Sequence, residues 1–198
     1  QQINLEAALQ SMVLLQNPSS VLPLRRGKTI AVIGPHAVSH RDLLSDYIID
    51  QLCWKGPMRG GTCWPTIGEA FQRLHDANVD VFEGVEINST NRTMIAPALH
   101  AASTADQVVL CLGVGNTEEH EGHDRMDIGL PGLQEEFAQS VLALGKPTVI
   151  ILVNGGPLAI DTLVGGKHSI VEAFYPSTRG GEALYLQLSG QTNRWGKL

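Results

Sequence analysis

The sequence predicts an α/β fold, a three-layer sandwich with helices on both faces of a mostly parallel, five- to six-stranded sheet. Strand-like and helix-like segments alternate along the 198 residues, and this alternation is typical of parallel strands joined by crossover helices. The strand-like segments are short, apolar and rich in β-branched residues, as expected for strands that are buried on both faces. No internal repeat interrupts the order, so residues 1–198 are predicted to form a single α/β-sandwich domain.

The elements at the start of the chain have distinct sequence patterns. Residues 5–16 (LEAALQSMVLLQ) carry apolar side chains at helical spacing and are predicted to form one amphipathic helix. Residues 29–33 (TIAVI) are a continuous apolar run that predicts a buried strand. Thr66 and Glu69 have the spacing of a capping box, which predicts that a helix begins just after Thr66.

The rest of the chain continues the alternation. Predicted strands cover residues 79–85, 107–112, 148–153 and 169–174, and predicted helices cover residues 92–103, 133–144 and 182–188. Residues 36–64 have weak periodicity and many glycines, which predicts a long loop. Because the carboxyl ends of parallel strands meet at one edge of a sheet, we expect this loop and the loop after residue 112 to share that edge.

The charge pattern argues against nucleic acid and membranes as partners. The formal net charge is −6, and no run of basic residues is longer than Arg25-Arg26, so an anionic polymer or membrane surface finds no basic patch in the sequence. No apolar run approaches the roughly 20 residues that a membrane-spanning helix needs. The sequence therefore predicts a globular domain that binds neither nucleic acid nor membranes.

The cysteines and the glycosylation sequons bear on the compartment. Cys53 and Cys63 flank a Gly-rich turn and can pair in an oxidising compartment, whereas Cys111 lies in an apolar strand and is predicted to be a buried thiol. Sequons begin at Asn88 and Asn91. The sequons and the paired cysteines are features of a secreted or lysosome-like compartment.

An acidic loop follows the predicted strand at residues 107–112. Residues 118–125 (EEHEGHDR) hold four carboxylates, Glu118, Glu119, Glu121 and Asp124. Crowding of carboxylates raises the free energy of the fully ionised state, so at least one pKa should rise. A carboxyl group with a raised pKa is what a general acid at neutral pH requires. The alternative is a solvated acidic loop with ordinary pKa values.

Other kinds of site fit the sequence less well. The glycines at residues 34 and 113–115 match neither G-x-G-x-x-G nor G-K-S/T, so a nucleotide-binding domain is a weak alternative. The segment H-E-G-H at residues 120–123 is one residue short of the zinc-binding H-E-x-x-H, so no metal site is predicted. No G-x-S-x-G elbow for a nucleophilic serine occurs.

Several segments, in order along the chain, resemble motifs of one enzyme family. Residues 119–125 (EHEGHDR) with 130–134 (LPGLQ) resemble the pattern E-x-E-G-x-D-R … L-P-G-x-Q. Further matching segments are residues 7–17 with 22–24, residues 30–37, residues 175–183 and residues 193–198. Together these segments make nearly the whole chain resemble the second, α/β-sandwich domain of glycoside hydrolase family 3, the β-glucosidases and β-xylosidases.

The resemblance implies a retaining glycosidase with two carboxyl groups about 5–5.5 Å apart and without cofactor or metal. In the family, an Asp on a preceding (β/α)₈ barrel is the nucleophile and a Glu of this domain is the general acid/base. The motif assigns the acid/base to Glu119, with Glu121 as the alternative. By the same resemblance, Asp124 and Arg125 are expected to form a pair that shapes the loop.

The resemblance also predicts what the chain lacks. The barrel and its nucleophile are absent from the sequence, so the chain is predicted to be a fragment of a longer enzyme and to be inactive without the barrel. The expected partners are that N-terminal barrel and a β-linked oligosaccharide or glycoside. Trp54 and Trp64 either stack on a sugar or pack within their loop. A non-catalytic carbohydrate-binding or interaction module is the alternative function.

Overall fold

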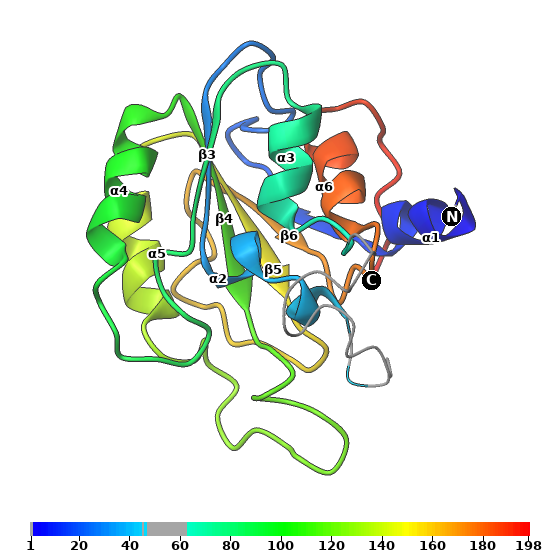
Figure 1. Cartoon of the computed structure of the whole chain (residues 1–198), viewed down its shortest axis with the longest axis vertical. Helices are drawn as coiled ribbons and strands as arrows, with labels where there is room; N and C mark the ends of the chain where they lie inside the picture. The colour runs from blue at the N-terminus through cyan, green and yellow to red at the C-terminus, as the bar shows by residue number, and fades with distance from the viewer. Residues whose placement is uncertain (1, 45, 47–62) are drawn as a thin grey trace.

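The computed structural model describes residues 2–44, 46 and 63–198. The strands are β1 (Val13–Gln16), β2 (Ile30–Ile33), β3 (Val79–Phe82), β4 (Gln107–Gly113), β5 (Thr148–Val153) and β6 (Ser169–Glu172). The helices are α1 (Gln2–Ser11), α2 (Pro35–Val38), α3 (Ile67–Leu74), α4 (Ile95–Thr104), α5 (Gln134–Leu142) and α6 (Gly180–Leu188), with a 3₁₀ turn at Arg41–Leu43. Figure 1 shows these elements as one α/β unit.

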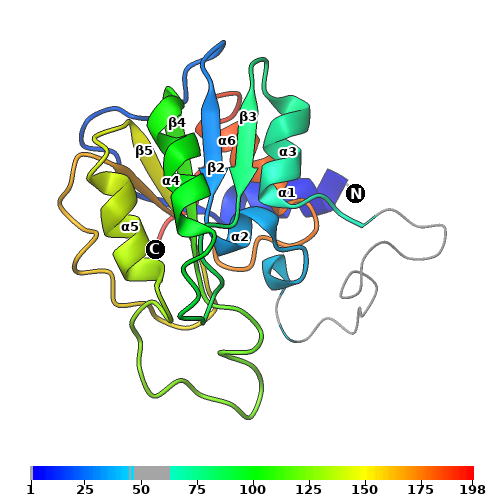
Figure 2. The ribbon, with the colours of Figure 1, turned by 60° about the vertical axis from the view of Figure 1, so that its left-hand side comes forward.

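The strands form one sheet in the order β1-β6-β5-β4-β2-β3. All neighbouring strands are parallel except β1, which runs antiparallel to β6. Helices α1, α3 and α6 cover one face, and α4 and α5 cover the other (Figure 2). The predicted three-layer α/β sandwich with a mostly parallel sheet is confirmed.

Strand β4 shows how the apolar runs build this sandwich. Successive side chains of a strand point to opposite faces of the sheet. Val109 and Cys111 accordingly pack in the core with α1, α3 and α6, whereas Val108, Leu110 and Leu112 pack with α4 and α5. All seven residues of β4 are buried. A continuously apolar sequence is therefore required here, and each fully buried Leu or Val side chain contributes about 1.5–3 kcal/mol.

The predicted helix over residues 5–16 is wrong in its second half. Helix α1 ends at Ser11, and Val13–Gln16 form the edge strand β1, in which Val13 pairs with Glu172 and Leu14 with Val171 of β6. Leu9, within α1, and Met12, just after it, are both buried, as their apolar spacing predicts. The backbone of the next residues nevertheless pairs with the free edge of β6, and this long-range pairing overrides the local pattern.

Residues near the two ends of the chain are bonded to each other. The Gly196 amide donates to the Met12 carbonyl at 2.7 Å, and Arg194 forms an ion pair with Glu6. A side chain at position 196 would meet the Gln10 carbonyl at 2.6 Å, so this close approach requires glycine. The segment between α1 and β1 and the tail after α6 therefore lie at the same corner of the sheet.

Most other sequence predictions differ from the structure only at element ends. The capping box is confirmed, because the Glu69 amide donates to Thr66 Oγ1 at 3.1 Å and the Thr66 amide donates to the Glu69 carboxylate at 2.8 Å. The predicted loop that begins at residue 36 contains the short helix α2 and the 3₁₀ turn. Strands β3 and β6 end earlier than predicted, at Phe82 and Glu172.

The cysteines fall into two classes. Cys63 is disulfide-bonded, and Cys53, its expected partner, lies outside the described residues. Cys111 is free and fully buried, and burial raises the pKa of its thiol, as expected for an inert core cysteine. Both sequon asparagines, Asn88 and Asn91, are exposed.

Candidate active site

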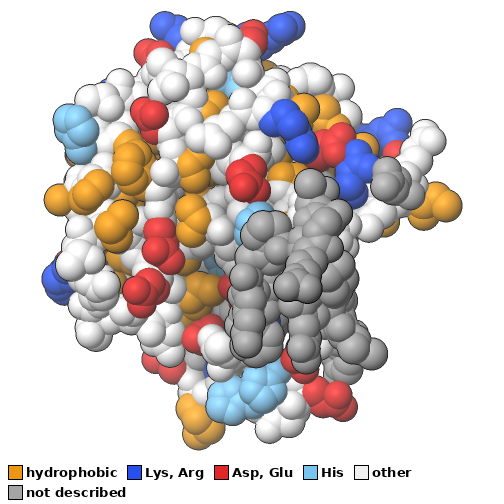
Figure 3. All heavy atoms as spheres, viewed as in Figure 1, with side chains coloured by type: hydrophobic (Ala, Val, Ile, Leu, Met, Phe, Trp, Pro, Cys, Tyr) orange, Lys and Arg blue, Asp and Glu red, His pale blue; other side chains and the backbone are white. Residues whose placement is uncertain are grey.

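The acidic loop lies at the carboxyl edge of the sheet, as the strand order requires. It leaves β4 at Gly113 and passes beside the turn that follows β5 and the residues that follow β6 (Figure 1). Histidine and acidic side chains gather over it at the lower end of the molecule (Figure 3). Gly113 has a φ of +145°, and a Cβ there would lie 1.9 Å from the Val153 carbonyl oxygen, so only glycine lets the chain turn out of the sheet here.

An open cavity of about 550 Å³ lies between this loop and the two neighbouring turns. Its lining residues are Asp46, Glu119, His120, Glu121, Gly122, His123, Asp124, Arg125, Ile128, Gly155, Gly156, Pro157 and Tyr175. A larger cavity of about 630 Å³ lies at the opposite edge, where β4, β5 and β6 begin, and no carboxylate lines it. The ionisable groups of the acidic loop therefore place the candidate site at the carboxyl edge.

Glu119 is fixed in place by donors from three parts of the chain. The Gly155 amide and the Tyr175 hydroxyl each donate to Glu119 Oε1 at 2.6 Å. The Gly156 amide donates at 3.1 Å and Arg125 Nε at 3.2 Å. We call these four residues (Arg125, Gly155, Gly156 and Tyr175) the Glu119 anchor. The Glu119 side chain is only 15% exposed.

The Glu119 anchor favours the ionised carboxylate. Partial burial raises the pKa of Glu119, but the Tyr175 hydroxyl, the two glycine amides and Arg125 together lower it, and the net pKa lies below its ordinary value. Burial, the hydrogen bond to Glu119 and the nearby carboxylates raise the pKa of Tyr175, so its hydroxyl remains a proton donor in this contact. Glu119 is therefore held as the acceptor of these hydrogen bonds.

Glu121 differs from Glu119 in its exposure and in its hydrogen-bond partners. Its side chain is exposed and lines the cavity, and no residue in the described part of the chain forms a hydrogen bond or ion pair with its carboxylate. Its backbone amide donates to Asp46 at 3.1 Å. Glu121 and Gly122 form the tip of a tight turn closed by backbone hydrogen bonds between His120 and His123.

The glycine and the histidines define this turn. Gly122 has a φ of +79°, a conformation that other residues adopt only at a cost. The rings of His120 and His123 stack with centroids 5.0 Å apart. Both glutamates line the cavity, but the turn leaves Glu121 exposed whereas Glu119, two residues earlier, is held by the Glu119 anchor.

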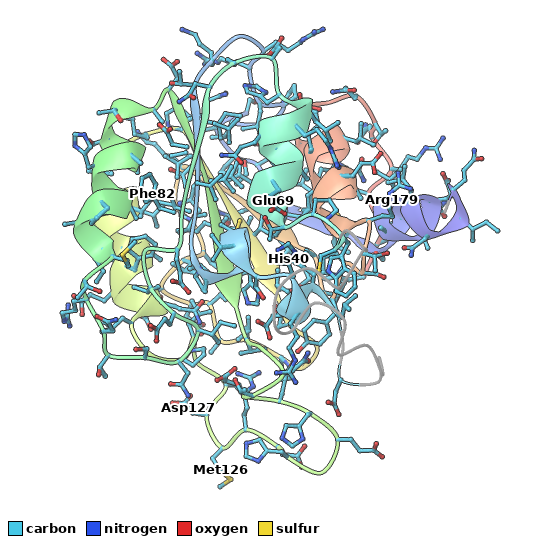
Figure 4. All side chains as sticks on the ribbon, in the orientation of Figure 1. His40, Glu69, Phe82, Met126, Asp127 and Arg179 are labelled. Atoms are coloured by element: carbon cyan, nitrogen blue, oxygen red, sulfur yellow. The ribbon has the colours of Figure 1, made fainter. Side chains whose placement is uncertain are left out.

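Arg125 binds Glu119 rather than Asp124, so the expected Asp124–Arg125 pair is not formed. The Arg125 guanidinium also donates to the Pro157 carbonyl at 2.6 Å, which ties the acidic loop to the turn after β5. Asp124 is exposed and lines the cavity. Met126 is fully exposed and Ile128 half exposed, and Figure 4 shows Met126 and Asp127 on the part of the loop that lies away from the sheet.

Of the two tryptophans named from the sequence, only Trp64 lies in the described part of the chain, and it does not line the cavity. Trp64 Nε1 donates to the His40 carbonyl at 2.7 Å, His40 Nδ1 lies 2.8 Å from the Trp64 carbonyl, and the indole packs against the core (Figure 4, His40). Trp64 therefore packs within its loop, the second of its two predicted roles. Trp54 lies outside the described residues.

Sequence reasoning missed Tyr175, Gly155 and Gly156 as site residues. Their signal was present, because N-G-G-P follows β5, Y-P follows β6, and both strands end at the same edge as β4. Within the described ranges, no three His, Cys, Asp or Glu side chains are grouped to hold a metal ion. No described helix has the length and apolar character needed to cross a bilayer.

The pKa of Glu119 predicts how stability depends on pH. Because the folded pKa lies below the unfolded value, ionised Glu119 stabilises the fold above that value, near 4.5, and this stabilisation is lost as the pH falls through the folded pKa. We expect Glu119→Gln to lower the free energy of unfolding by about 2 kcal/mol at pH 7 and by less at pH 3. Urea unfolding at both pH values measures this. Glu121→Gln is the matched control and should change little at either pH, whereas a Glu119→Gln defect that grows on acidification would contradict the prediction.

The fold and the site define a class: an α/β-sandwich domain that presents a carboxylate-bearing loop at the carboxyl edge of its sheet. The chain belongs to glycosyl hydrolase family 3, because residues 12–198 match the family's C-terminal domain.

Curated relatives include both xylosidases and glucosidases. The chain is 36% identical over 193 residues to the exo-1,4-beta-xylosidase bxlB of Emericella nidulans, covering 96% of this chain and 24% of that protein. It is 31% identical over 207 residues to the periplasmic beta-glucosidase of Salmonella typhimurium, covering 98% of this chain and 27% of that protein. Among solved structures, a family 3 exo-beta-xylosidase, XlnD, in complex with a xylobiose aziridine activity-based probe superposes with a TM-score of 0.84 at 30% identity, covering 96% of this chain and 24% of that one. The chain thus spans about a quarter of the length of these relatives.

Proposed function

We propose that this chain is the acid/base-bearing domain of a retaining β-glycosidase that hydrolyses O-glycosyl bonds of β-xylosides or β-glucosides. The family match supports the reaction class, and the names of the relatives support both sugars. The observation that carries the proposal is the acidic loop, held at the sheet edge by the Glu119 anchor with a second, exposed carboxylate, that of Glu121, beside it.

Within this site, we assign the general acid/base to Glu121 and the anchoring role to Glu119. A general acid needs a proton near neutral pH, and the four donors around Glu119 oppose protonation. Glu121 is exposed, lines the cavity, and has no hydrogen bond or ion pair to its carboxylate from the described residues, so its carboxyl group is open to a docked substrate. The exposed Met126 and Ile128 on the same loop supply apolar surface for such docking.

The proposed reaction has two steps. The nucleophilic Asp of an N-terminal (β/α)₈ barrel attacks the anomeric carbon while Glu121 protonates the departing glycosidic oxygen. The same carboxylate then removes a proton from the water that hydrolyses the glycosyl-enzyme. The two carboxyl groups must lie about 5–5.5 Å apart, so the barrel has to seat its catalytic face against the carboxyl edge of this sheet.

Comparing the isolated chain with the longer enzyme that includes the barrel tests this function. The isolated chain should show no turnover of aryl β-xylosides or β-glucosides, since half of the carboxylate pair is absent, and the longer enzyme should hydrolyse at least one of them. Rates are measured by release of the aryl alcohol. A longer enzyme that binds β-linked oligosaccharides but hydrolyses none would instead support a carbohydrate-binding module. Activity of the chain alone would contradict the proposal that the two catalytic carboxyl groups lie on different domains.

A further inference from the structure

Glu172, at the end of β6, is a buried carboxylate outside the cavity lining. It is 9% exposed and is the only acidic residue in the buried part of the described chain. Burial raises the pKa of its carboxyl group, and a buried acid costs free energy unless donors satisfy its oxygens. Each oxygen of Glu172 has one donor, and each donor leads to a different part of the Glu119 anchor.

The hydrogen bond from the Phe174 amide to Glu172 fixes the backbone conformation just before Tyr175. Glu172 Oε1 accepts a hydrogen bond from the Phe174 amide at 2.8 Å. Phe174 has a φ of +52°, an uncommon conformation for a residue other than glycine, which persists only where neighbouring contacts enforce it. The next residue is Tyr175, whose hydroxyl donates to Glu119. The Glu172–Phe174 bond therefore fixes the backbone from which the tyrosine reaches Glu119.

The contact between Glu172 and Asn154 fixes the conformation of the turn after β5. Glu172 Oε2 lies 3.4 Å from Asn154 Nδ2, and the same nitrogen donates to the Gly156 carbonyl at 3.0 Å. Asn154 is buried and its Oδ1 has no partner among the described residues, so the two Nδ2 contacts orient the side chain. The turn held in this way presents the Gly155 and Gly156 amides to Glu119.

We infer that Glu172 is a positioning residue that aligns both the Tyr175 side and the Gly155–Gly156 side of the Glu119 anchor, and through Glu119 the loop that carries Glu121. The inference rests on the proposed function, in which Glu121 is the acid/base. A positioning residue and a residue that only stabilises the sheet differ in the effect of their loss. Loss of a positioning residue shifts the anchor and therefore slows proton transfer more than it weakens substrate binding.

Kinetics of Glu172→Gln and Glu172→Leu in the barrel-containing enzyme test this role. Gln keeps an acceptor for the Phe174 amide but places an NH₂ against Asn154, whereas Leu removes both contacts. We expect kcat for an alkyl β-glycoside to fall about tenfold in Glu172→Leu and less in Glu172→Gln, with KM nearly unchanged. For a dinitrophenyl glycoside, whose phenolate departs without protonation, kcat/KM reports formation of the glycosyl-enzyme and should change less than about twofold, whereas kcat/KM for the alkyl glycoside should fall with its kcat.

Ser169→Ala is the matched control on the same strand. Ser169 is fully buried at the other end of β6 and donates to Asn17 at 2.6 Å, so its loss should lower thermal stability without any dependence on the leaving group. A Glu172 effect that is equal for both substrates would reduce Glu172 to a structural residue and overturn the inference. So would an undiminished Glu172 effect in the Glu119→Gln background, where the contacts between the anchor and residue 119 are already weakened.

The result for Glu121→Gln separates this inference from the proposed function. Suppose that Glu121→Gln loses more rate on the alkyl glycoside than on the dinitrophenyl glycoside but the Glu172 variants do not. That result overturns the role of Glu172 alone. If Glu121→Gln shows no difference between the two substrates, the proposed acid/base assignment is overturned, and the positioning role of Glu172 is overturned as well.

Discussion

Replacement of Glu121 by Gln in the barrel-containing enzyme should lower kcat by about 10²- to 10⁴-fold for β-glycosides with alkyl leaving groups, the usual contribution of a general acid. An alkoxide is a poor leaving group and needs the proton that Glu121 is proposed to supply. A dinitrophenolate departs unassisted, so formation of the glycosyl-enzyme from a dinitrophenyl glycoside should be little affected. Azide attacks the glycosyl-enzyme without a general base, so added azide should restore turnover of the dinitrophenyl substrate. Steady-state rates on both substrates, with and without azide, measure these effects.

Glu135→Gln is the control for the loss of a negative charge. Glu135 is an exposed glutamate in the first turn of α5, outside the candidate site, and its replacement should leave both rates unchanged. Wild-type rates for Glu121→Gln on alkyl glycosides would rule out Glu121 as the acid.

Glu119→Gln should produce a smaller and different defect. The glutamine presents one acceptor oxygen where the carboxylate presented two and loses the charge that attracts Arg125, so the acidic loop is held less firmly. We expect kcat to fall about ten- to a hundredfold on alkyl glycosides, with no rescue by azide, because Glu121 remains to act as the base. Tyr175→Phe removes one of the four donors and should give a milder form of the same defect.

The comparison of the two glutamates decides which one is the acid. The sequence motif favours Glu119, whereas the hydrogen bonds around Glu119 favour Glu121. Azide rescue of Glu119→Gln, together with a mild defect in Glu121→Gln, would return the acid/base role to Glu119. The two assignments predict opposite results for the two variants, so measuring both variants on the same pair of substrates distinguishes them.

The fold was largely predictable because its signals are local. The capping box at Thr66 and Glu69 lies within four residues, and the buried strand β4 is a single apolar run. Strand β1 was not predictable in this way. Val13–Gln16 continue a helical pattern, and only the free edge of β6, more than 150 residues later in the chain, makes them a strand.

The candidate site was predictable in its location but not in the division of roles. The acidic loop stood out by composition, and its place at the sheet edge followed from strand order. The environment of Glu119 depends on donors 36, 37 and 56 residues away, in two loops whose approach to the carboxylate no periodicity encodes. Two glutamates separated by one residue therefore had the same local signal, although one accepts hydrogen bonds from four residues and the carboxylate of the other has no partner among the described residues.

The bond between Gly196 and Met12 fastens the tail after α6 to the junction between α1 and the edge strand β1. Because β1 pairs with β6, release of the tail should also loosen this edge of the sheet, although the two segments lie at opposite ends of the sequence.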